Sequence, residues 1–360
     1  MQRGLVSIMM PAFNAARYIG GAIESILVQT YSNWELLVVN DGSTDATAEV
    51  AARFTDPRIK LINKGNGGES SARNVALDNS IGEFIAYLDA DDAYLPHHLA
   101  STISYLESHA DRDAVYTDGY HIDQDGTFLK SLQKRRRGPF EGRVFEEAVR
   151  ASDIFGPPIC VVLRHELVAK HHLRYDPRIV IGPDWDFFVR YADLAQFGYV
   201  DEPTCLYRVH QTNITVQVDS TRRKGYLALC REKSIKLENF KTCSVETRVA
   251  VFYDLLINLL DGQPEHQTAV TEWPEFTALP ASEQARLLRL MTSQAVLQGR
   301  NPSQIASWLE RAFALNPSDA RARVLGALYK VSPRLCQGLL RVRSPFAVER
   351  QGMAPFADLT

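Results

Sequence analysis

Three carboxylates directly follow an apolar run that reads as a buried strand. In the stretch GEFIAYLDADDAYL, residues 83–88 lead into Asp89, Asp91 and Asp92. Like charges this close repel each other, so solvent, a basic side chain or a metal ion must offset them. Two hard oxygen ligands two residues apart suit Mg²⁺ or Mn²⁺, which bind one or two protein carboxylates together with phosphate oxygens. The alternative is a solvated turn in which Asp92 caps a helix.

The spacing of these aspartates is not specific by itself. The pattern Asp-x-Asp occurs four times, beginning at Asp89, Asp111, Asp123 and Asp184. Only the first copy lies at the end of a predicted strand of the N-terminal sheet. Its position in the fold therefore decides the assignment.

Two further segments carry residues that suit a phosphorylated ligand. The segment NGGESSARN combines a glycine pair, helix-starting serines and Arg73, so backbone N–H groups and a permanent cation could face phosphate. Asp41 follows another strand-like run and could accept hydrogen bonds from a ribose or a base. The alternatives are a strand–helix turn with an exposed arginine and a tight Asp41-Gly42 turn. A Gly-x-x-x-x-Gly-Lys-[Ser/Thr] loop is absent from the sequence.

Alternating strand-like and helical periods position these residues. Strands are expected over 5–11, 34–40, 59–63 and 83–88, with Asn14 as the N-cap of one helix and Ser70 or Ser71 opening another. This alternation predicts an α/β fold with a mixed, mostly parallel, Rossmann-like sheet flanked by helices. Ligands bind beyond the carboxyl ends of such strands. The polar residues gather at that edge: Pro11, Asn14, Asp41, Asp45, Asn66, Asp89 and Asp91.

The rest of the chain divides into two regions. From residue 114 a hairpin pattern, a helix near 144–151, a helix in the later part of 182–198 and a strand over 199–210 are expected. Beyond residue 216 only helical periods remain, so the predicted regions are 1–110, 111–215 and 216–360. Residues 306–329 resemble parts of tetratricopeptide repeats near 300–330. A plain helical hairpin is the alternative, since a solenoid needs about three repeats.

Composition excludes some partners and compartments. The net charge of -3 gives no reason to expect nucleic acid, and the five cysteines are scattered without metal-ligand spacing. Such cysteines suit the reducing cytoplasm. The N-terminus has no signal-peptide layout, and no apolar run reaches the roughly 18 residues of a membrane span. A soluble protein is expected, with peripheral contact through the C-terminal helices to the inner face of the membrane or to a protein. His97-His98 and His171-His172 are expected to be exposed.

Six motifs in order resemble family 2 glycosyltransferases of the GT-A fold, from about Leu5 to His210. These motifs are PAFNAARYI, VVNDGSTDAT, GNGGESSARN, YLDADD, GPDWDFFVR and YRVH. The resemblance implies inverting transfer of a sugar from a nucleotide diphosphate sugar, expected to be a UDP-sugar, to a glycan or glycolipid hydroxyl. It assigns Asp184 as the base, and Asp91 and His210 to a divalent Mn²⁺ or Mg²⁺. It assigns the nucleotide sugar to Pro11, Ala12, Phe13, Asn14, Asp41, Asn66, Gly67, Arg73, Asp89 and Ala90.

One departure from the family pattern leaves other functions open. The family commonly has Glu-Asp where this chain has Pro183-Asp184, and Asp186 is an alternative base that helical spacing turns away from Asp184. A non-catalytic sensor of nucleotide sugar, or a scaffold that uses its helical tail, is the competing hypothesis. A nucleotidyltransferase would need a glycine-rich, lysine-bearing loop after the first strand, which PAFNAARYI lacks.

Overall fold

The chain forms two compact units, Met1–Val218 and Asp219–Thr360, in a computed structural model. The structure describes all residues except 135–136, 212–217, 261–263 and 343–360. The boundary between the units lies close to the predicted change at residue 216. The regions 1–110 and 111–215 fall together within the first unit.

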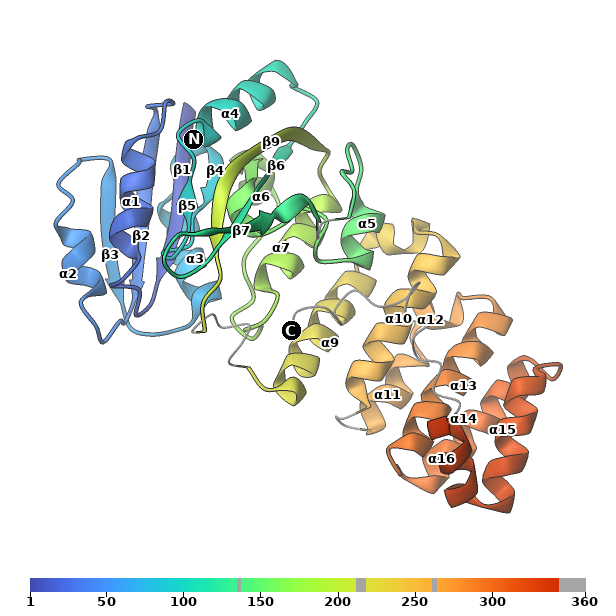
Figure 1. Ribbon diagram of the computed structural model, residues 1–360. Helices are drawn as coiled ribbons and strands as arrows, with labels where there is room; N and C mark the ends of the chain where they lie inside the picture. Colours follow the sequence, from blue (N-terminus) through green and yellow to red (C-terminus); the bar gives the residue numbers. More distant parts are fainter. Residues whose placement is uncertain (135–136, 212–217, 261–263, 343–360) are drawn as a thin grey trace. The chain divides into compact units, whose positions relative to one another are not determined.

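A nine-stranded sheet forms the centre of the first unit (Figure 1). Its order is β3-β2-β1-β4-β8-β6-β9-β5, with β7 paired to β6. The strands are β1 Gln2–Ala12, β2 Trp34–Asp41, β3 Ile59–Lys64, β4 Gly82–Tyr87, β5 Ala93–Tyr94, β6 Ala114–Ile122, β7 Phe128–Ser131, β8 Val161–Arg164 and β9 Phe197–Arg208.

The sheet is parallel in its first half and mixed in its second. Strands β3, β2, β1 and β4 pair in parallel, as the strand–helix alternation predicts. Strand β8 runs antiparallel to both β4 and β6, whereas β9 is parallel to β6. The carboxyl ends of the four parallel strands therefore meet at one edge, where the chain places its polar residues.

Helices flank this sheet, and most of them pack directly on its strands. Strand β2 is buried along its whole length, and α3 packs on β1 and β2. A two-sided cover explains the continuous apolar sequence of these strands. The helices are α1 Ile19–Leu27, α2 Thr47–Ala52, α3 Glu69–Asn79, α4 His98–Ser108, α5 Phe145–Arg150, α6 His165–Lys170 and α7 Pro183–Ala192, with short 3₁₀ turns at Leu132–Lys134 and Pro158–Cys160.

The second unit is helical throughout its described residues. No helix described there or in the first unit is long and apolar enough to cross a bilayer. Helices α13 to α16 pack on their neighbours in chain order, and α16 also packs on α13. The elements are α9 Ser220–Ile235, a 3₁₀ turn at Glu238–Thr242, α10 Val245–Leu259, α11 Pro264–Val270, α12 Pro274–Thr277, α13 Ala281–Leu297, α14 Pro302–Leu315, α15 Ala320–Val331 and α16 Pro333–Val342.

Asn14 is not the predicted helix N-cap. Helix α1 begins at Ile19, with Tyr18 at its N-cap position. Asn14 instead has a left-handed backbone, with φ of 49°. Its side-chain Oδ1 accepts a hydrogen bond from the Thr44 N–H at 2.8 Å, and its own N–H donates to Ser43 Oγ at 3.0 Å. Asn14 therefore joins the loops that follow β1 and β2.

His98 is buried, contrary to the expectation of an exposed histidine. Its ring stacks on Tyr94 with centroids 3.9 Å apart, and Nδ1 lies 2.7 Å from Thr204 Oγ1. Burial lowers the pKa of His98 to about 3, and neighbouring His97 lowers it further. The folded protein thus holds a neutral imidazole, whereas the unfolded chain takes up a proton near pH 6.5.

This difference predicts a loss of stability in mild acid. Because the unfolded state binds one more proton between pH about 6.5 and 3, His98 makes the free energy of unfolding fall as pH falls, by up to about 1.4 kcal/mol per pH unit. We expect His98→Gln to flatten the slope between pH 6.5 and 5, above the range where most carboxylates titrate. Urea unfolding at several pH values measures that slope.

Exposed His171 provides the control for this measurement. His171→Gln should keep the wild-type slope. Equal slopes for wild type and His98→Gln would show that His98 is not held neutral by the fold.

Candidate functional site

A buried arginine joins the start of α3 to the end of β4. The Nη2 atom of Arg73 lies 2.8 Å from Glu69 Oε1 and 2.9 Å from Asp89 Oδ1. Only 1% of the Arg73 side chain is exposed, compared with 30% for Glu69 and 26% for Asp89. The guanidinium also lies 5.5 Å from the ring centre of Tyr175. Its Nε and Nη1 have no hydrogen-bond partner among the described residues. Arg73 thus acts in this structure by fixing two carboxylates.

The carboxylates of the site influence one another strongly. Burial raises the pKa of Glu69 to about 7; Arg73 opposes this shift, and Asp89, Asp184 and Asp91 add to it. Burial also raises the pKa of Asp89 against the effect of Arg73, with a further contribution from Asp91. The predicted Asp89, Asp91 and Asp184 therefore lie within electrostatic reach of one carboxyl group. Residues from three distant parts of the chain meet at this edge.

Asp91 and His210 form a pair at the same edge. The Nε2 atom of His210 lies 2.9 Å from Asp91 Oδ2, and the His210 ring stacks on Tyr18 with centroids 5.1 Å apart. No group of three or more His, Cys, Asp or Glu side chains suited to a metal occurs in the described parts of the chain. A carboxylate and an imidazole at this separation suit two neighbouring ligands of an octahedral cation. Oxygens of a bound diphosphate and water would complete such a shell.

Asp92 has a structural role beside this pair. Its Oδ1 accepts a hydrogen bond from the backbone N–H of Arg208 at 2.7 Å, and the Arg208 Nε donates to the carbonyl oxygen of Asp91 at 2.7 Å. Asp92 is 2% exposed, and burial raises its pKa well above the usual range, with contributions from Asp91 and Asp89. These bonds hold the end of β9, and hence His210, against the end of β4.

Asp41 holds the loop between β3 and α3. Its carboxylate pairs with Lys64 and accepts hydrogen bonds from the N–H groups of Gly67 at 3.0 Å and Gly68 at 2.7 Å. Asn66 Nδ2 donates to the Asp41 carbonyl oxygen at 3.1 Å. The predicted Asp41, Asn66 and Gly67 are thus brought together, but the Asp41 carboxylate is occupied by donors of the loop itself.

Glycine is required at the turn that follows Asp41. Gly42 has φ of 72°, and a Cβ built there would lie 2.7 Å from the backbone nitrogen of Asn66. A larger residue would both strain the turn and push the two loops apart. The Asp41-Gly42 turn is therefore a point of close loop contact as well as a tight turn.

The remaining predicted residues of the nucleotide-sugar group differ in exposure. Pro11 and Ala12 end β1, in register with Val39 and Asn40 of β2. Phe13 follows with 52% of its surface exposed, whereas Ala12 and Ala90 are 2% and 5% exposed. Phe13 thus presents an exposed aromatic ring next to the Asn14 junction, while the two alanines allow close backbone packing.

Asp184 and Asp186 lie on the first turn of α7 but in different surroundings. Gly182 takes a left-handed φ of 78° as N-cap, and Pro183 occupies the first turn, where its missing N–H costs no helical hydrogen bond. Asp186 is 3% exposed and pairs with Arg190, with Oδ2 to Nη2 at 2.6 Å. Asp184 is half-buried and is the carboxylate of this turn that acts on Glu69 and Asp89. This arrangement favours Asp184 over Asp186 as the base.

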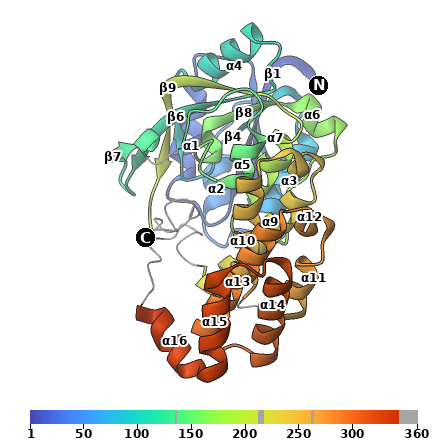
Figure 2. The same cartoon turned by 90° about the vertical axis from the view of Figure 1, so that its right-hand side faces the viewer.

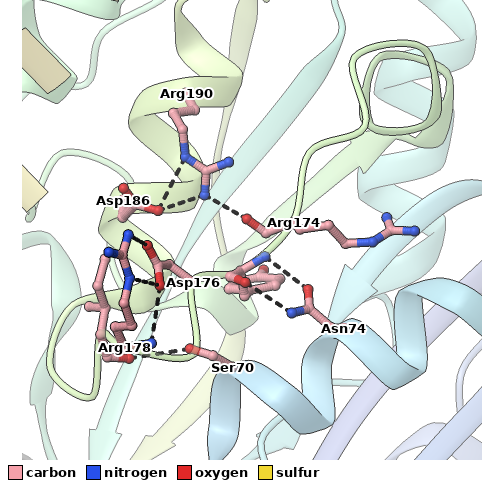
Figure 3. A network of polar contacts seen from close by, with 9 residues as sticks. Ser70, Asn74, Arg174, Asp176, Arg178, Asp186 and Arg190 are labelled. Atoms are coloured by element: carbon pink, nitrogen blue, oxygen red, sulfur yellow. Dashed lines mark hydrogen bonds and ion pairs between the residues drawn. The ribbon is translucent and has the colours of Figure 1, made fainter. Parts of the chain in front are cut away.

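A network of polar contacts joins α7 to α3 through the segment before it (Figure 3). Asn74 on α3 donates to the Tyr175 carbonyl oxygen and accepts from the Tyr175 N–H, both at 2.9 Å. Ser70 Oγ donates to the Ile179 carbonyl oxygen at 3.3 Å, and Arg190 Nη2 donates to the Arg174 carbonyl oxygen at 2.7 Å. The start of α7, with Asp184, is therefore positioned by α3.

Two residues of this site, Glu69 and Tyr18, are not among the site residues predicted from the sequence. Glu69 is four residues before Arg73 on one helix face, and this spacing is the signal that could have identified the ion pair. Tyr18 packs on His210, and the Arg208 guanidinium lies 5.1 Å from its ring centre. Tyr18 and the 208–210 segment are far apart in the sequence, so no local pattern could have shown that contact.

The chain is similar to known proteins in sequence and in fold. Residues 7–170 match the family described as Glycosyl transferase family 2. An uncharacterized glycosyltransferase of Rickettsia typhi is 32% identical over 215 residues, which cover 59% of this chain and 66% of that protein. The UDP-Glc:alpha-D-GlcNAc-diphosphoundecaprenol beta-1,3-glucosyltransferase WfgD of Escherichia coli is 48% identical over 103 residues, 28% of this chain and 41% of that protein. The chain matches only part of the length of these relatives: 66% of the Rickettsia typhi protein and 33% of an uncharacterized glycosyltransferase of Rickettsia conorii.

The fold is also similar to that of a solved structure. The crystal structure of S. aureus TarS 1-349 in complex with UDP-GlcNAc has a TM-score of 0.58 and 16% sequence identity, with 98% of this chain and 93% of that chain covered. At this identity the likeness concerns the fold alone. It includes the GT-A architecture predicted from the motif order.

The different surroundings of Asp184 and Asp186 predict different costs of substitution. Asp186→Asn removes the charge that neutralises largely buried Arg190, so we expect the free energy of unfolding to fall by about 3 kcal/mol. Asp184→Asn loses a favourable charge near a helix N-terminus but also relieves repulsion from Glu69 and Asp89, so the expected cost is below about 1 kcal/mol. Urea unfolding of the two variants measures this difference. Equal costs would contradict the division into a structural and a reactive carboxylate.

Proposed function

The chain belongs to glycosyl transferase family 2, and from this premise we propose that it transfers a sugar from a nucleoside diphosphate sugar to a hydroxyl of a glycan or glycolipid. The observation that carries the proposal is the ion pairing of Glu69 and Asp89 with one buried arginine at the carboxyl edge of the sheet, within electrostatic reach of Asp91 and Asp184. Such an edge is where α/β sheets bind ligands. A reaction that needs a base opposite a charged leaving group would use this arrangement.

The proposed donor site uses the loops that follow the first four strands. Exposed Phe13 supplies an aromatic face for the base or ribose, next to the junction made by Asn14. The loop organised by Asp41, with Asn66 and Gly67, and the ends of β1 and β4 at Pro11, Ala12, Asp89 and Ala90 complete the proposed nucleotide-sugar contacts. Arg73 supports them by holding the Asp89 carboxylate in place. We assign the donor as a UDP-sugar because TarS was solved with UDP-GlcNAc and WfgD uses UDP-Glc.

Asp184 is the proposed general base. It would take the proton of the acceptor hydroxyl as that oxygen attacks the anomeric carbon opposite the departing diphosphate, which inverts the configuration there. Direct displacement of this kind needs no covalent carboxylate, so one base suffices. The ion pair of Asp186 with Arg190 supports the choice, because Asp186 Oδ2 already accepts hydrogen bonds from the Arg190 guanidinium. A lipid-linked acceptor is proposed from the diphosphoundecaprenol substrate named for WfgD.

Asp91 and His210 are the proposed holders of Mn²⁺ or Mg²⁺. A divalent cation bound there would neutralise negative charge on the leaving diphosphate. The separation of their donor atoms suits a cation that shares its shell with a substrate phosphate. Tyr18 packs on the His210 ring, and Arg208 donates to the Asp91 carbonyl oxygen, so both residues help to position the pair.

Loss of the base should separate turnover from binding. We expect Asp184→Asn to lower nucleoside diphosphate release from the accepted donor by at least about 100-fold, while donor affinity changes less than about threefold. A panel of nucleotide sugars, with and without acceptor extracts, identifies the donor by release of nucleoside diphosphate, and calorimetry gives the affinity.

The exposed carboxylate of Asp111 provides the control, since it pairs only with adjacent Arg112 among the described residues. Asp111→Asn should behave as wild type. Turnover by Asp184→Asn at the wild-type rate would remove Asp184 from the mechanism. A donor that wild type binds but never turns over with any acceptor would instead favour the sensor hypothesis.

Substitution of Asp91 or His210 should weaken the binding of Mn²⁺ in the presence of nucleoside diphosphate. We expect EDTA to abolish wild-type turnover, and Asp91→Ala or His210→Ala to raise the Mn²⁺ concentration for half-maximal rate at least about tenfold. Electron paramagnetic resonance of free Mn²⁺, with nucleoside diphosphate present, measures binding apart from activity. His109→Ala, at an exposed position outside the site, is the control. Full activity in EDTA would contradict the metal assignment.

A further inference from the structure

The last two described helices carry positive charge without negative charge. Between Ala320 and Val342 the sequence contains no Asp or Glu but five basic residues, although the whole chain has a net charge of -3. All five are exposed: Arg321, Arg323, Lys330, Arg334 and Arg341. This segment is therefore a local basic region on a mildly acidic protein, and its natural partner is an anion.

The same helices also expose aliphatic side chains. Leu335 and Leu339, four residues apart on one face of α16, are 52% and 43% exposed, and Val331 at the end of α15 is 79% exposed. On the other face of α16, Cys336 is 1% exposed, and Gln337 Nε2 donates to the Leu297 carbonyl oxygen of α13 at 2.9 Å. Helix α16 is thus packed on one side and apolar on its free side.

An exposed apolar face is unusual on a surface helix such as α16. Helix α16 packs on α15 and on α13, and Figure 2 shows α15 and α16 together at the red end of the chain. A surface helix normally presents polar residues on the side away from its packing partners. Here the outer face combines leucines and a valine with flanking cations, which indicates an external partner.

Charge decides between the candidate partners. A second copy docking through the same face would bring the same cations opposite each other, since a twofold contact joins identical patches. An anionic lipid bilayer suits both the basic and the aliphatic side chains of these helices. Its head groups pair with Lys and Arg, and the aliphatic side chains enter the interface beneath the head groups. The long stems of Lys and Arg can extend from that depth to the phosphates.

We propose that the terminal-helix surface, formed by Val331, Leu335 and Leu339 with Lys330, Arg334 and Arg341, docks the protein on an anionic membrane. This inference does not depend on the proposed glycosyl transfer. It adds a place of action, at the bilayer surface, that would serve an acceptor carried on a lipid.

Vesicle sedimentation of the full chain tests this proposal. Wild type is mixed with phosphatidylcholine vesicles that contain either no or about 30% phosphatidylglycerol, a content that gives a strongly negative surface. We expect at least about tenfold stronger binding to the anionic vesicles, weakened by added salt. The double variants Leu335→Asp/Leu339→Asp and Arg334→Glu/Arg341→Glu should each lose at least about tenfold in binding.

Matched substitutions elsewhere control for general effects of charge. Val245→Asp changes a 39% exposed aliphatic residue of the same unit, and Arg53→Glu/Lys170→Glu reverses two exposed cations of the first unit. Both should bind as wild type, and all variants should keep the wild-type thermal midpoint. Wild type that sediments with neither vesicle, or terminal-helix variants that bind as wild type, would overturn the proposal. A change in oligomeric state without a change in vesicle binding would overturn it in favour of a second copy.

Discussion

The buried guanidinium of Arg73 is the interaction on which the candidate site depends. Removing an arginine from water costs several kcal/mol unless anions and hydrogen bonds surround it. Here Glu69 and Asp89 supply the anions, and the rings of Tyr87 and Tyr175 lie beside the cation at 6.0 and 5.5 Å. Because Arg73 needs both carboxylates, the start of α3 and the end of β4 are held at a fixed separation.

The same interaction leaves the site with more negative than positive charge. One arginine faces Glu69 and Asp89, and Asp91 and Asp184 add to the field at Glu69. Such an excess raises carboxyl pKa values and favours a bound cation. The proposed divalent ion would offset this excess negative charge. Because the Arg73 side chain is 1% exposed, its pairs with these carboxylates are screened less than pairs between exposed side chains.

Much of this arrangement follows from the sequence, because it depends on local periodicity. The strands ending near Pro11, Asn40 and Leu88 are predictable from apolar runs, and parallel pairing then brings their carboxyl ends together. Asn14 was wrong as an N-cap because a tertiary contact with Thr44 and Ser43 outweighs its capping preference. Burial of His98 depends on Thr204, more than a hundred residues away, so no local pattern could reveal it.

Pairings between distant segments are also what set the neighbourhood of Asp184. Its helix is predictable from Gly182-Pro183 and the aromatic spacing that follows, but not its approach to Glu69. That approach depends on contacts such as those of Asn74 with Tyr175. Sequence reasoning could name Asp184 only through the family's motif order, since a carboxylate on a helix start has many ordinary uses.

The two-way hydrogen bonding of Asn74 with Tyr175 has a consequence for how such proteins can be recombined. The predicted donor and acceptor halves share one continuous sheet, with β4 paired to β8 and α3 bonded to the segment that precedes α7. A hybrid of two such proteins joined near residue 110 would take the two sides of these contacts from different proteins, which have not evolved to fit each other. A junction near residue 218, between the two compact units, leaves the sheet and its carboxyl edge intact. Donor and acceptor preference would then be inherited together, while the helical unit could be exchanged as a separate cassette.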